Sequence, residues 1–125
     1  MNIFGIGIDI VDIDRIKNIY SKYGIKFAKK ILNKDEIEFF DKSNDKVSFL
    51  AKRFAAKEAI GKAFGIGILN GYLLKSISIR NDEFGKPIAI LNEIKKFQSC
   101  NDKIIHLTIA DEKRYAIANA LILNK

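Results

Sequence analysis

Between Asn2 and Ile10 the chain alternates between large apolar residues and small or polar ones, which is the period of a β-strand. One face of this predicted strand carries large apolar side chains, namely Phe4, Ile6, Ile8 and Ile10. The other face is nearly bare and ends in a carboxylate, with Gly5, Gly7 and Asp9 in turn. The pattern therefore predicts a strand that presents one acid on a face without bulky neighbours.

Apolar residues then recur at helical spacing, which predicts an amphipathic helix that begins near Asp12 or Asp14, with an aspartate as its N-cap. The buried stripe of this helix should consist of Ile16, Ile19, Tyr20, Tyr23 and Phe27. Gly24 is expected to break or bend the helix. The segment that follows the strand, as far as Phe27, is therefore expected to be helical.

Two further helices are predicted before residue 66. Asn33 and Glu36 have the spacing of a capping box, which would open a short helix that ends at Phe40. A longer helix should run from Lys46 to Phe64, with Gly65 as its C-terminal stop.

The second half of the chain has the pattern of strands separated by turn residues. The expected elements are strands at Ser76–Arg80 and Ile88–Leu91 around a turn, a short helix at Asn92–Gln98, and a hairpin of Ile104–Ala110 with Tyr115–Leu123. Helices followed by antiparallel pairs indicate an α+β fold. A chain of 125 residues is expected to form one domain, residues 1–125.

Composition narrows the classes of partner. The chain has 22 basic and 15 acidic residues and a formal net charge of +7, which favours anionic partners. Its N-terminus lacks a basic region with a cleavage site, and no apolar run is long enough to span a bilayer, so we expect a cytoplasmic protein without membrane contact. Cys100 is the only cysteine and is expected to be a structural thiol near a helix end.

The end of the longest predicted helix carries more charge than packing requires. Arg53, Lys57 and Lys62 surround a single carboxylate, Glu58, among alanines and glycines. Arg53 and Lys57 are four residues apart, and two like charges at this spacing repel unless an anion lies between them. The cluster suits a phosphate-rich ligand with a bridging metal. An ordinary ion pair between Glu58 and Lys62, also four apart, explains the same residues.

Asp9 and Glu58 are the candidate metal ligands. Mg²⁺ binds through one or two carboxylates together with substrate phosphates and water. Asp9 on the bare strand face can accept such an ion without crowding, and Glu58 can supply a second oxygen. Asp9 is equally well explained as an acid at a strand end or helix N-cap.

His106, the only histidine, shares the polar face of its predicted strand with Thr108 and Ala110. It can contact phosphate or act as a base, or it can be a half-exposed histidine without a role. The segment Arg15–Lys30 carries six cations and no acid, which makes it either a solvated face or a docking surface for an acidic protein. Motifs for a Walker phosphate loop, a serine elbow or cysteine–histidine metal binding are absent.

These motifs together resemble the holo-acyl-carrier-protein synthase family, the short bacterial 4′-phosphopantetheinyl transferases, over nearly the whole chain. The segment from Gly5 to Ile16 is similar to the first motif of the family, and the segment from Arg53 to Ala63 is similar to its second and highly specific motif. The turn at Gly85–Pro87 and the hairpin around His106 follow in the expected order. The resemblance implies an antiparallel sheet packed against a long helix.

The resemblance also implies a reaction. The family transfers phosphopantetheine from coenzyme A to a serine of apo-acyl carrier protein in fatty acid biosynthesis and releases adenosine 3′,5′-bisphosphate. By similarity, Asp9 and Glu58 would hold Mg²⁺ on the pyrophosphate, and Lys62 would steady the β-phosphate with help from Lys57. The nucleotide end would contact Arg53, His106 and the turn residues Gly85, Lys86 and Pro87.

The same resemblance implies partners. The acidic carrier protein would dock on the basic segment, with Arg15, Lys22 and Lys26 as its contacts, and three copies of the chain would form a homotrimer with active sites at the interfaces. Many members have a histidine where this chain has Asp111. Glu58, His106 and a water bound to the metal all remain candidate bases.

Two alternatives stay open. One is a small basic module that binds a nucleotide or RNA without catalysis, although no predicted strand presents a stacking platform with interleaved cations. The other is a transferase of the same family that acts on a carrier domain of a polyketide or peptide synthetase.

Overall fold

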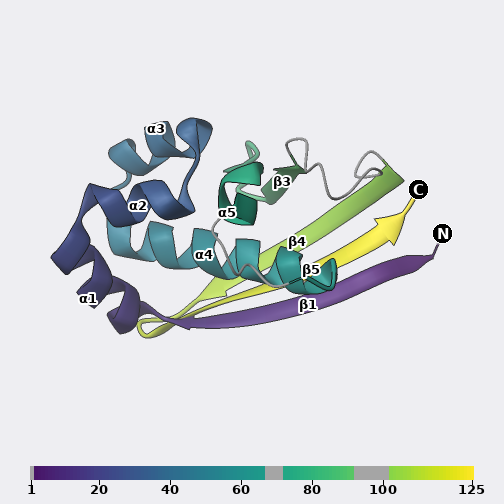
Figure 1. Ribbon diagram of the computed structural model, residues 1–125, viewed down its shortest axis with the longest axis horizontal. Coiled ribbons are helices and arrows are strands. Elements are labelled where there is room, and N and C mark those ends of the chain that lie inside the picture. The colour runs from purple at the N-terminus through teal and green to yellow at the C-terminus, as the bar shows by residue number, and fades with distance from the viewer. Residues whose placement is uncertain (1, 67–71, 92–101) are drawn as a thin grey trace.

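The computed structural model describes residues 2–66, 72–91 and 102–125, with the side chains of residues 72 and 73 left aside. Its largest sheet consists of β1 (Ile3–Asp12), β5 (Tyr115–Asn124) and β4 (Lys103–Asp111), in the order β1-β5-β4. The first and last strands of the chain, β1 and β5, are therefore neighbours, and both pairings in the sheet are antiparallel. The two termini consequently lie at the same end of this sheet (Figure 1).

Helix α4 (Lys46–Ala63) lies along one face of this sheet (Figure 1). The glycines of β1 allow the close approach. A Cβ atom added at Gly7 would lie 2.0 Å from the carbonyl oxygen of Ala59, and one added at Gly5 would lie 1.8 Å from that of Ala63. The bare face of the strand therefore packs against the backbone of α4, and this contact brings Asp9 to the helix.

Three shorter helices gather at the end of the sheet away from the termini (Figure 1). They are α1 (Ile13–Tyr23), α2 (Ile25–Ile31) and α3 (Lys34–Lys42). As predicted, the Asp12 side chain caps α1, and Asn33 with Glu36 forms a complete capping box at the start of α3. Gly24, at φ 59°, separates α1 from α2, so the basic segment Arg15–Lys30 forms two helices rather than one.

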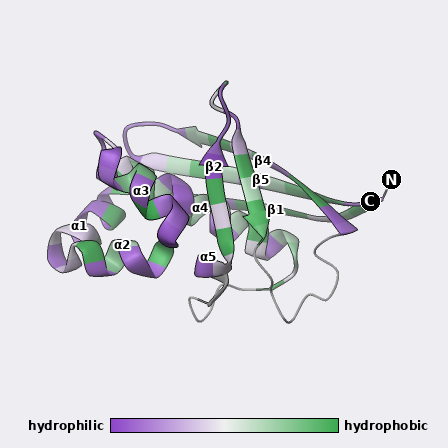
Figure 2. Cartoon of the chain, turned by 90° about the horizontal axis from the view of Figure 1, so that it is seen from above, coloured by the Kyte–Doolittle hydropathy of each residue, from purple (hydrophilic) through white to green (hydrophobic). Residues whose placement is uncertain are grey.

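A second, two-stranded sheet consists of β2 (Ile77–Asn81) and β3 (Pro87–Leu91), and the short helix α5 (Tyr72–Ser76) precedes it. Figure 2 shows this hairpin from above, with β2 beside α3 and β3 beside β4. The fold is thus the predicted α+β arrangement of an antiparallel sheet against a long helix. The predicted helix Asn92–Gln98 and Cys100 lie outside the described residues.

The apolar face of β1 points away from α4. Ile6, Ile8 and Ile10 are 67%, 61% and 59% exposed, and Ile117 on β5 belongs to the same face. The register also places His106 there, because it pairs with Leu121, which pairs with Ile6. Among the described residues, nothing covers this face. None of the helices in the described ranges has the length and apolarity needed to cross a membrane.

Candidate active site

Asp9 and Lys62 form an ion pair where β1 meets the last turns of α4. The Lys62 ammonium donates to Asp9 Oδ1 at 3.0 Å and to the carbonyl oxygen of Ile8 at 3.0 Å. The Lys62 side chain is 53% exposed and that of Asp9 is 14% exposed. Because the lysine is half exposed, water screens this pair, and it contributes about 0–1 kcal/mol to stability.

Glu58 lies one helical turn before Lys62, near the ion pair of Lys62 with Asp9. Partial burial raises the pKa of Glu58, and the negative charge of Asp9 raises it further. The positive charges of Lys62 and Arg15 act in the opposite direction. These four charges are therefore neighbours, so the structure brings together Asp9, Glu58 and Lys62, three of the residues that the sequence singled out, and places Arg15 beside them.

Arg53 lines a separate hollow of about 270 Å³ nearer the start of α4. The lining residues come from α4, the β2–β3 turn and the end of β4, and they are Phe49, Lys52, Arg53, Asn81, Gly85, Pro87, Ile109 and Asp111. The guanidinium carbon of Arg53 lies over the Phe49 ring, 4.6 Å from its centroid. The hollow thus unites three residues that the sequence assigned to cofactor binding, Arg53, Gly85 and Pro87.

Lys86, the remaining predicted residue of the turn, lies next to this hollow, and Asp111 belongs to its lining. Lys86 is exposed in the turn, and its backbone N–H donates to Asp82 Oδ1 at 2.9 Å. Asp111, which stands where many members of the family have histidine, accepts a hydrogen bond from the Ser48 hydroxyl at 3.4 Å. Asp111 therefore borders the Arg53 hollow rather than the carboxylate pair.

Lys57 lies elsewhere, in the interior. Its side chain is fully buried, and its ammonium donates to Glu36 Oε1 at 2.5 Å and to the carbonyl oxygens of Ile31 at 2.7 Å and Leu74 at 2.6 Å. Burial lowers the pKa of Lys57, while Glu36 raises it. An ammonium has three protons, and all three are used within the fold. The prediction that Lys57 contacts the cofactor is therefore wrong, and its role is structural.

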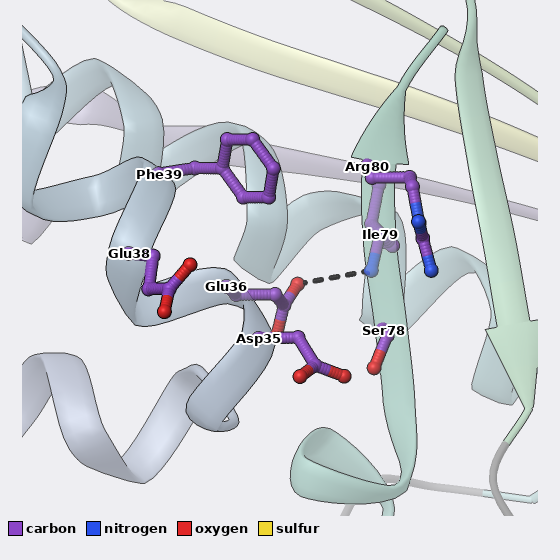
Figure 3. A pocket seen from close by; sticks show the side chains of 7 residues that line it. All are labelled: Asp35, Glu36, Glu38, Phe39, Ser78, Ile79 and Arg80. Carbon is purple, nitrogen blue, oxygen red and sulfur yellow. Dashed lines mark hydrogen bonds between the residues drawn. The ribbon is translucent and has the colours of Figure 1, made fainter.

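Glu36 is the partner that the sequence did not reveal. One carboxylate oxygen accepts from Lys57, and the other accepts from the backbone N–H of Ile79 at 3.1 Å, the bond drawn in Figure 3. The hollow beside it, about 250 Å³, is lined by three acids together with Phe39, Ser78, Ile79 and Arg80. Three carboxylates around one space disfavour a phosphate ligand, so this hollow does not compete with the Arg53 hollow for an anion.

The structure does not bring His106 to the carboxylate pair within one chain. His106 is exposed on the face of the sheet that points away from α4. Asp9 pairs with Ala118 on the opposite face, toward the helix. The sheet itself therefore separates His106 from Asp9 and Glu58.

The predicted docking residues are all exposed. Arg15 and Lys22 lie on α1 and Lys26 lies on α2. Of these three residues, Arg15 lies nearest the carboxylate pair, because its charge acts to lower the pKa of Glu58. The basic helices therefore border the carboxylate pair.

Comparison with known proteins bears on the first of the two sequence alternatives, the binding module without catalysis. Residues 5–120 match the family described as the 4′-phosphopantetheinyl transferase superfamily. The chain belongs to this superfamily. Membership favours a transferase over a nucleotide- or RNA-binding module without catalysis.

Members of the superfamily resemble the chain over almost its full length. The holo-[acyl-carrier-protein] synthase of Vibrio campbellii is 43% identical over 123 residues, which is 97% of this chain and 98% of that protein. The crystal structure of the Neisseria meningitidis synthase is 35% identical with a TM-score of 0.89 and covers 98% of this chain and 100% of that one. The Bacillus anthracis synthase, crystallised in complex with CoA (3′,5′-ADP), is 35% identical with a TM-score of 0.84 and covers 98% of both chains.

Two residues of this chain, Asn81 and Glu36, were not predicted from the sequence because their partners are remote along the chain. Asn81, which contacts Arg53, lies 28 positions after it, and Glu36 lies 21 positions before Lys57. Spacing rules for helices reach only three or four residues. The available signal for Glu36 was its place in a capping box, which explains its backbone contact but not its second, buried role.

Proposed function

We propose that this chain transfers 4′-phosphopantetheine from coenzyme A to a serine of apo-acyl carrier protein, giving holo-acyl carrier protein and adenosine 3′,5′-bisphosphate in fatty acid biosynthesis. The relatives named holo-[acyl-carrier-protein] synthase support this reaction. The observation that carries it is the layout of α4. Arg53 lines the hollow, whereas Glu58 and Lys62 lie at the carboxylate pair. Along the helix axis, Arg53 and Lys62 are about 14 Å apart. This layout suits a ligand with separated anionic groups, such as coenzyme A.

The carboxylate pair fits Mg²⁺ by its donor chemistry. Asp9 and Glu58 offer hard oxygen ligands. Burial, and after it the negative charge of Asp9, raises the pKa of Glu58, and a cation between the two carboxylates would relieve their repulsion. Among the described residues no group of three or more metal-ligating side chains occurs, so substrate phosphates would complete the ligand set. We therefore propose that Asp9 and Glu58 hold Mg²⁺, which when bound would offset charge on the pyrophosphate.

The remaining steps fall to the residues of the chain. The exposed ammonium of Lys62 can turn from Asp9 to a phosphate oxygen, where it opposes the negative charge that develops during attack by the serine. Arg53 and the Gly85–Pro87 turn would hold the nucleotide end. Of the two candidate side-chain bases, Glu58 and His106, only Glu58 lies at the carboxylate pair of the same chain.

The release of adenosine 3′,5′-bisphosphate tests this proposal. The purified chain, incubated with coenzyme A, apo-acyl carrier protein and Mg²⁺, should release one nucleotide for each carrier protein modified, as measured by chromatography. A chelator should stop the release, and added Mg²⁺ should restore it. Release at an undiminished rate in the chelator would contradict the metal assignment.

We propose that the carrier protein docks on the exposed cations Arg15, Lys22 and Lys26. Acyl carrier proteins are acidic, and complementary charge accelerates encounter between partners. Because Arg15 also acts on Glu58, reversing its charge would disturb docking and chemistry together. Lys22 and Lys26 separate the two effects.

Charge reversal at Lys22 and Lys26, as Lys22→Glu with Lys26→Glu, is expected to raise the KM for carrier protein about tenfold. The KM for coenzyme A should stay within about twofold, because neither residue lines the Arg53 hollow. The matched control is Lys103→Glu with Lys125→Glu, which makes the same change in net charge at the other end of the sheet (Figure 1). Steady-state kinetics with each substrate varied would measure both. Equal effects of the two double variants would count against docking on α1 and α2.

We propose that the exposed apolar face of the sheet is covered by further copies of the chain in a homotrimer. Single proteins seldom leave so many large apolar side chains together in water, and closed rings of identical subunits are a common way to cover them. Assembly would also give His106, which lies on this face, access to a neighbouring chain. Sedimentation equilibrium should give the mass of three chains, and Ile8→Glu should shift it towards one. A monomeric wild-type chain would contradict the trimer.

We propose that this reaction takes place in the cytoplasm. Recovery of the chain with the membrane fraction of lysed cells would contradict this location.

A further inference from the structure

The amide of Asn81 joins the two sides of the Arg53 hollow. Asn81 Oδ1 accepts a hydrogen bond from Arg53 Nη2 at 3.1 Å, and Asn81 Nδ2 donates to the carbonyl oxygen of Gly85 at 2.8 Å. Arg53 belongs to α4, whereas Gly85 lies in the turn between β2 and β3. One side chain at the end of β2 therefore holds a helix cation and a turn in fixed relation.

Arg53 needs such a partner because little else orients its guanidinium. Its Nε atom is buried without a hydrogen bond, and its ion pair with Glu36 Oε2, at 3.8 Å, is longer than a hydrogen bond and so does not fix the direction of the N–H groups. The cation–π contact with Phe49 holds the guanidinium near the ring but supplies no hydrogen-bond partner that sets the direction of its N–H groups. Within the described ranges, the bond to Asn81 is the one hydrogen bond that the guanidinium makes.

The turn that Asn81 holds is itself well ordered. Asp82 Oδ1 accepts from the backbone N–H groups of Phe84 and Lys86, both at 2.9 Å. The Asp82 carbonyl accepts from Gly85 at 3.0 Å, and Gly85 adopts a φ of 85° that favours glycine. The turn can therefore move as a unit, and the amide of Asn81 fixes that unit to Arg53.

We infer that Asn81 is a positioning residue: it orients Arg53 against the Gly85–Pro87 turn so that the guanidinium meets the 3′-phosphate at the nucleotide end of coenzyme A. This inference rests on the proposed function. Asn81 does not itself contact the reacting atoms, so it acts on binding of the cofactor rather than on the chemical step. Its loss should weaken recognition of the 3′-phosphate through Arg53 and leave turnover at saturation nearly unchanged.

The test compares coenzyme A with 3′-dephospho-coenzyme A, which lacks only that phosphate. Asn81→Ala should raise the KM for coenzyme A about tenfold, as expected for a lost hydrogen bond to a charged group, and raise the KM for the dephospho form less than twofold. The kcat should remain within about twofold. Asn124→Ala, an equal truncation at the far end of β5, should change neither constant. Thermal unfolding and calorimetric titration with coenzyme A would confirm that the variant is folded and binds more weakly.

Arg53→Ala and the double variant decide how Asn81 acts. Arg53→Ala should remove the preference for coenzyme A, and adding Asn81→Ala to it should have no further effect, because a positioning residue acts only through its target. If Arg53→Ala keeps the full preference, both the cofactor placement and the inference fail. Two other outcomes would overturn the inference alone, in each case with the preference lost in Arg53→Ala. One is that Asn81→Ala weakens the binding of coenzyme A and of its dephospho form equally. The other is that the losses caused by the two single changes add in the double variant.

Discussion

Asp9→Ala and Glu58→Ala are each expected to lower kcat/KM for phosphopantetheine transfer about a thousandfold or more. Each variant removes half of the carboxylate pair that fits Mg²⁺. The fold should survive, because the ion pair of Asp9 with Lys62 is partly exposed and Glu58 makes no hydrogen bond to another described residue that the fold requires. Coupled measurement of transfer rates and thermal unfolding separates the loss of activity from a loss of structure.

The control for this prediction is Asp102→Ala, which removes an exposed acid just before β4, at the other end of that strand from the Arg53 hollow. It should leave transfer within about twofold of wild type, as expected for a surface change remote from the site. Titration calorimetry with Mg²⁺ in the presence of coenzyme A gives a second readout, because the two site variants should lose the metal-dependent heat. Near-normal turnover by both site variants at saturating Mg²⁺ would show that the carboxylates do not hold the metal.

Lys57→Met is expected to lower the free energy of unfolding by about 3–5 kcal/mol. The change removes the ammonium that neutralises Glu36 and leaves the carbonyl oxygens of Ile31 and Leu74 without their donor. Methionine has a similar length, so the loss reflects unpaired buried polar groups rather than a large cavity. Urea unfolding followed by circular dichroism would measure the change.

The matched control is Lys52→Met, on the same helix but only half-buried, which should cost less than about 1 kcal/mol. The double variant Glu36→Gln with Lys57→Met should be less destabilised than the sum of the single changes, because each single change strands the other charge. Stability of Lys57→Met within about 1 kcal/mol of wild type would mean that the buried pair does not hold α3 to α4.

Most of the elements could be predicted from the sequence because their signals are local. An aspartate at position 12, the Asn33–Glu36 capping box and glycines at 24 and 65 mark helix ends through contacts within a few residues. The hairpin of β4 and β5 follows from two alternating segments around a polar turn. The separation of α2 from α1 was only partly visible, since a glycine can bend a helix or end it.

Which face of β1 is inside could not be decided from alternation alone. An alternating pattern defines two faces, and the more apolar one is ordinarily buried within the same chain. Here the glycine face packs on α4, and the isoleucine face is exposed. The glycines were the better signal, because a backbone that approaches another backbone closely has no room for a Cβ atom.

The site was predictable where residues act through their own position and not where they act through remote partners. Asp9 was singled out because strand alternation places it on the bare face, and Glu58 and Lys62 because they are charged residues four positions apart on one helix. The structure brings these three side chains together. Lys57 looked like one more cation of the same cluster, yet its position on α4 points into the core. A helix of small residues has no polar side that would distinguish an inward lysine from an outward one, so only the tertiary contact with Glu36 reveals it.

The central claim is that this chain moves phosphopantetheine from coenzyme A to acyl carrier protein, and intact-mass spectrometry of the carrier protein tests it most directly. Apo-carrier protein incubated with the chain, coenzyme A and Mg²⁺ should gain the mass of one phosphopantetheine. A carrier with alanine at the acceptor serine should gain none. An unmodified serine-containing carrier, together with salt-sensitive binding of RNA by the same preparation, would contradict the account and favour a binding module.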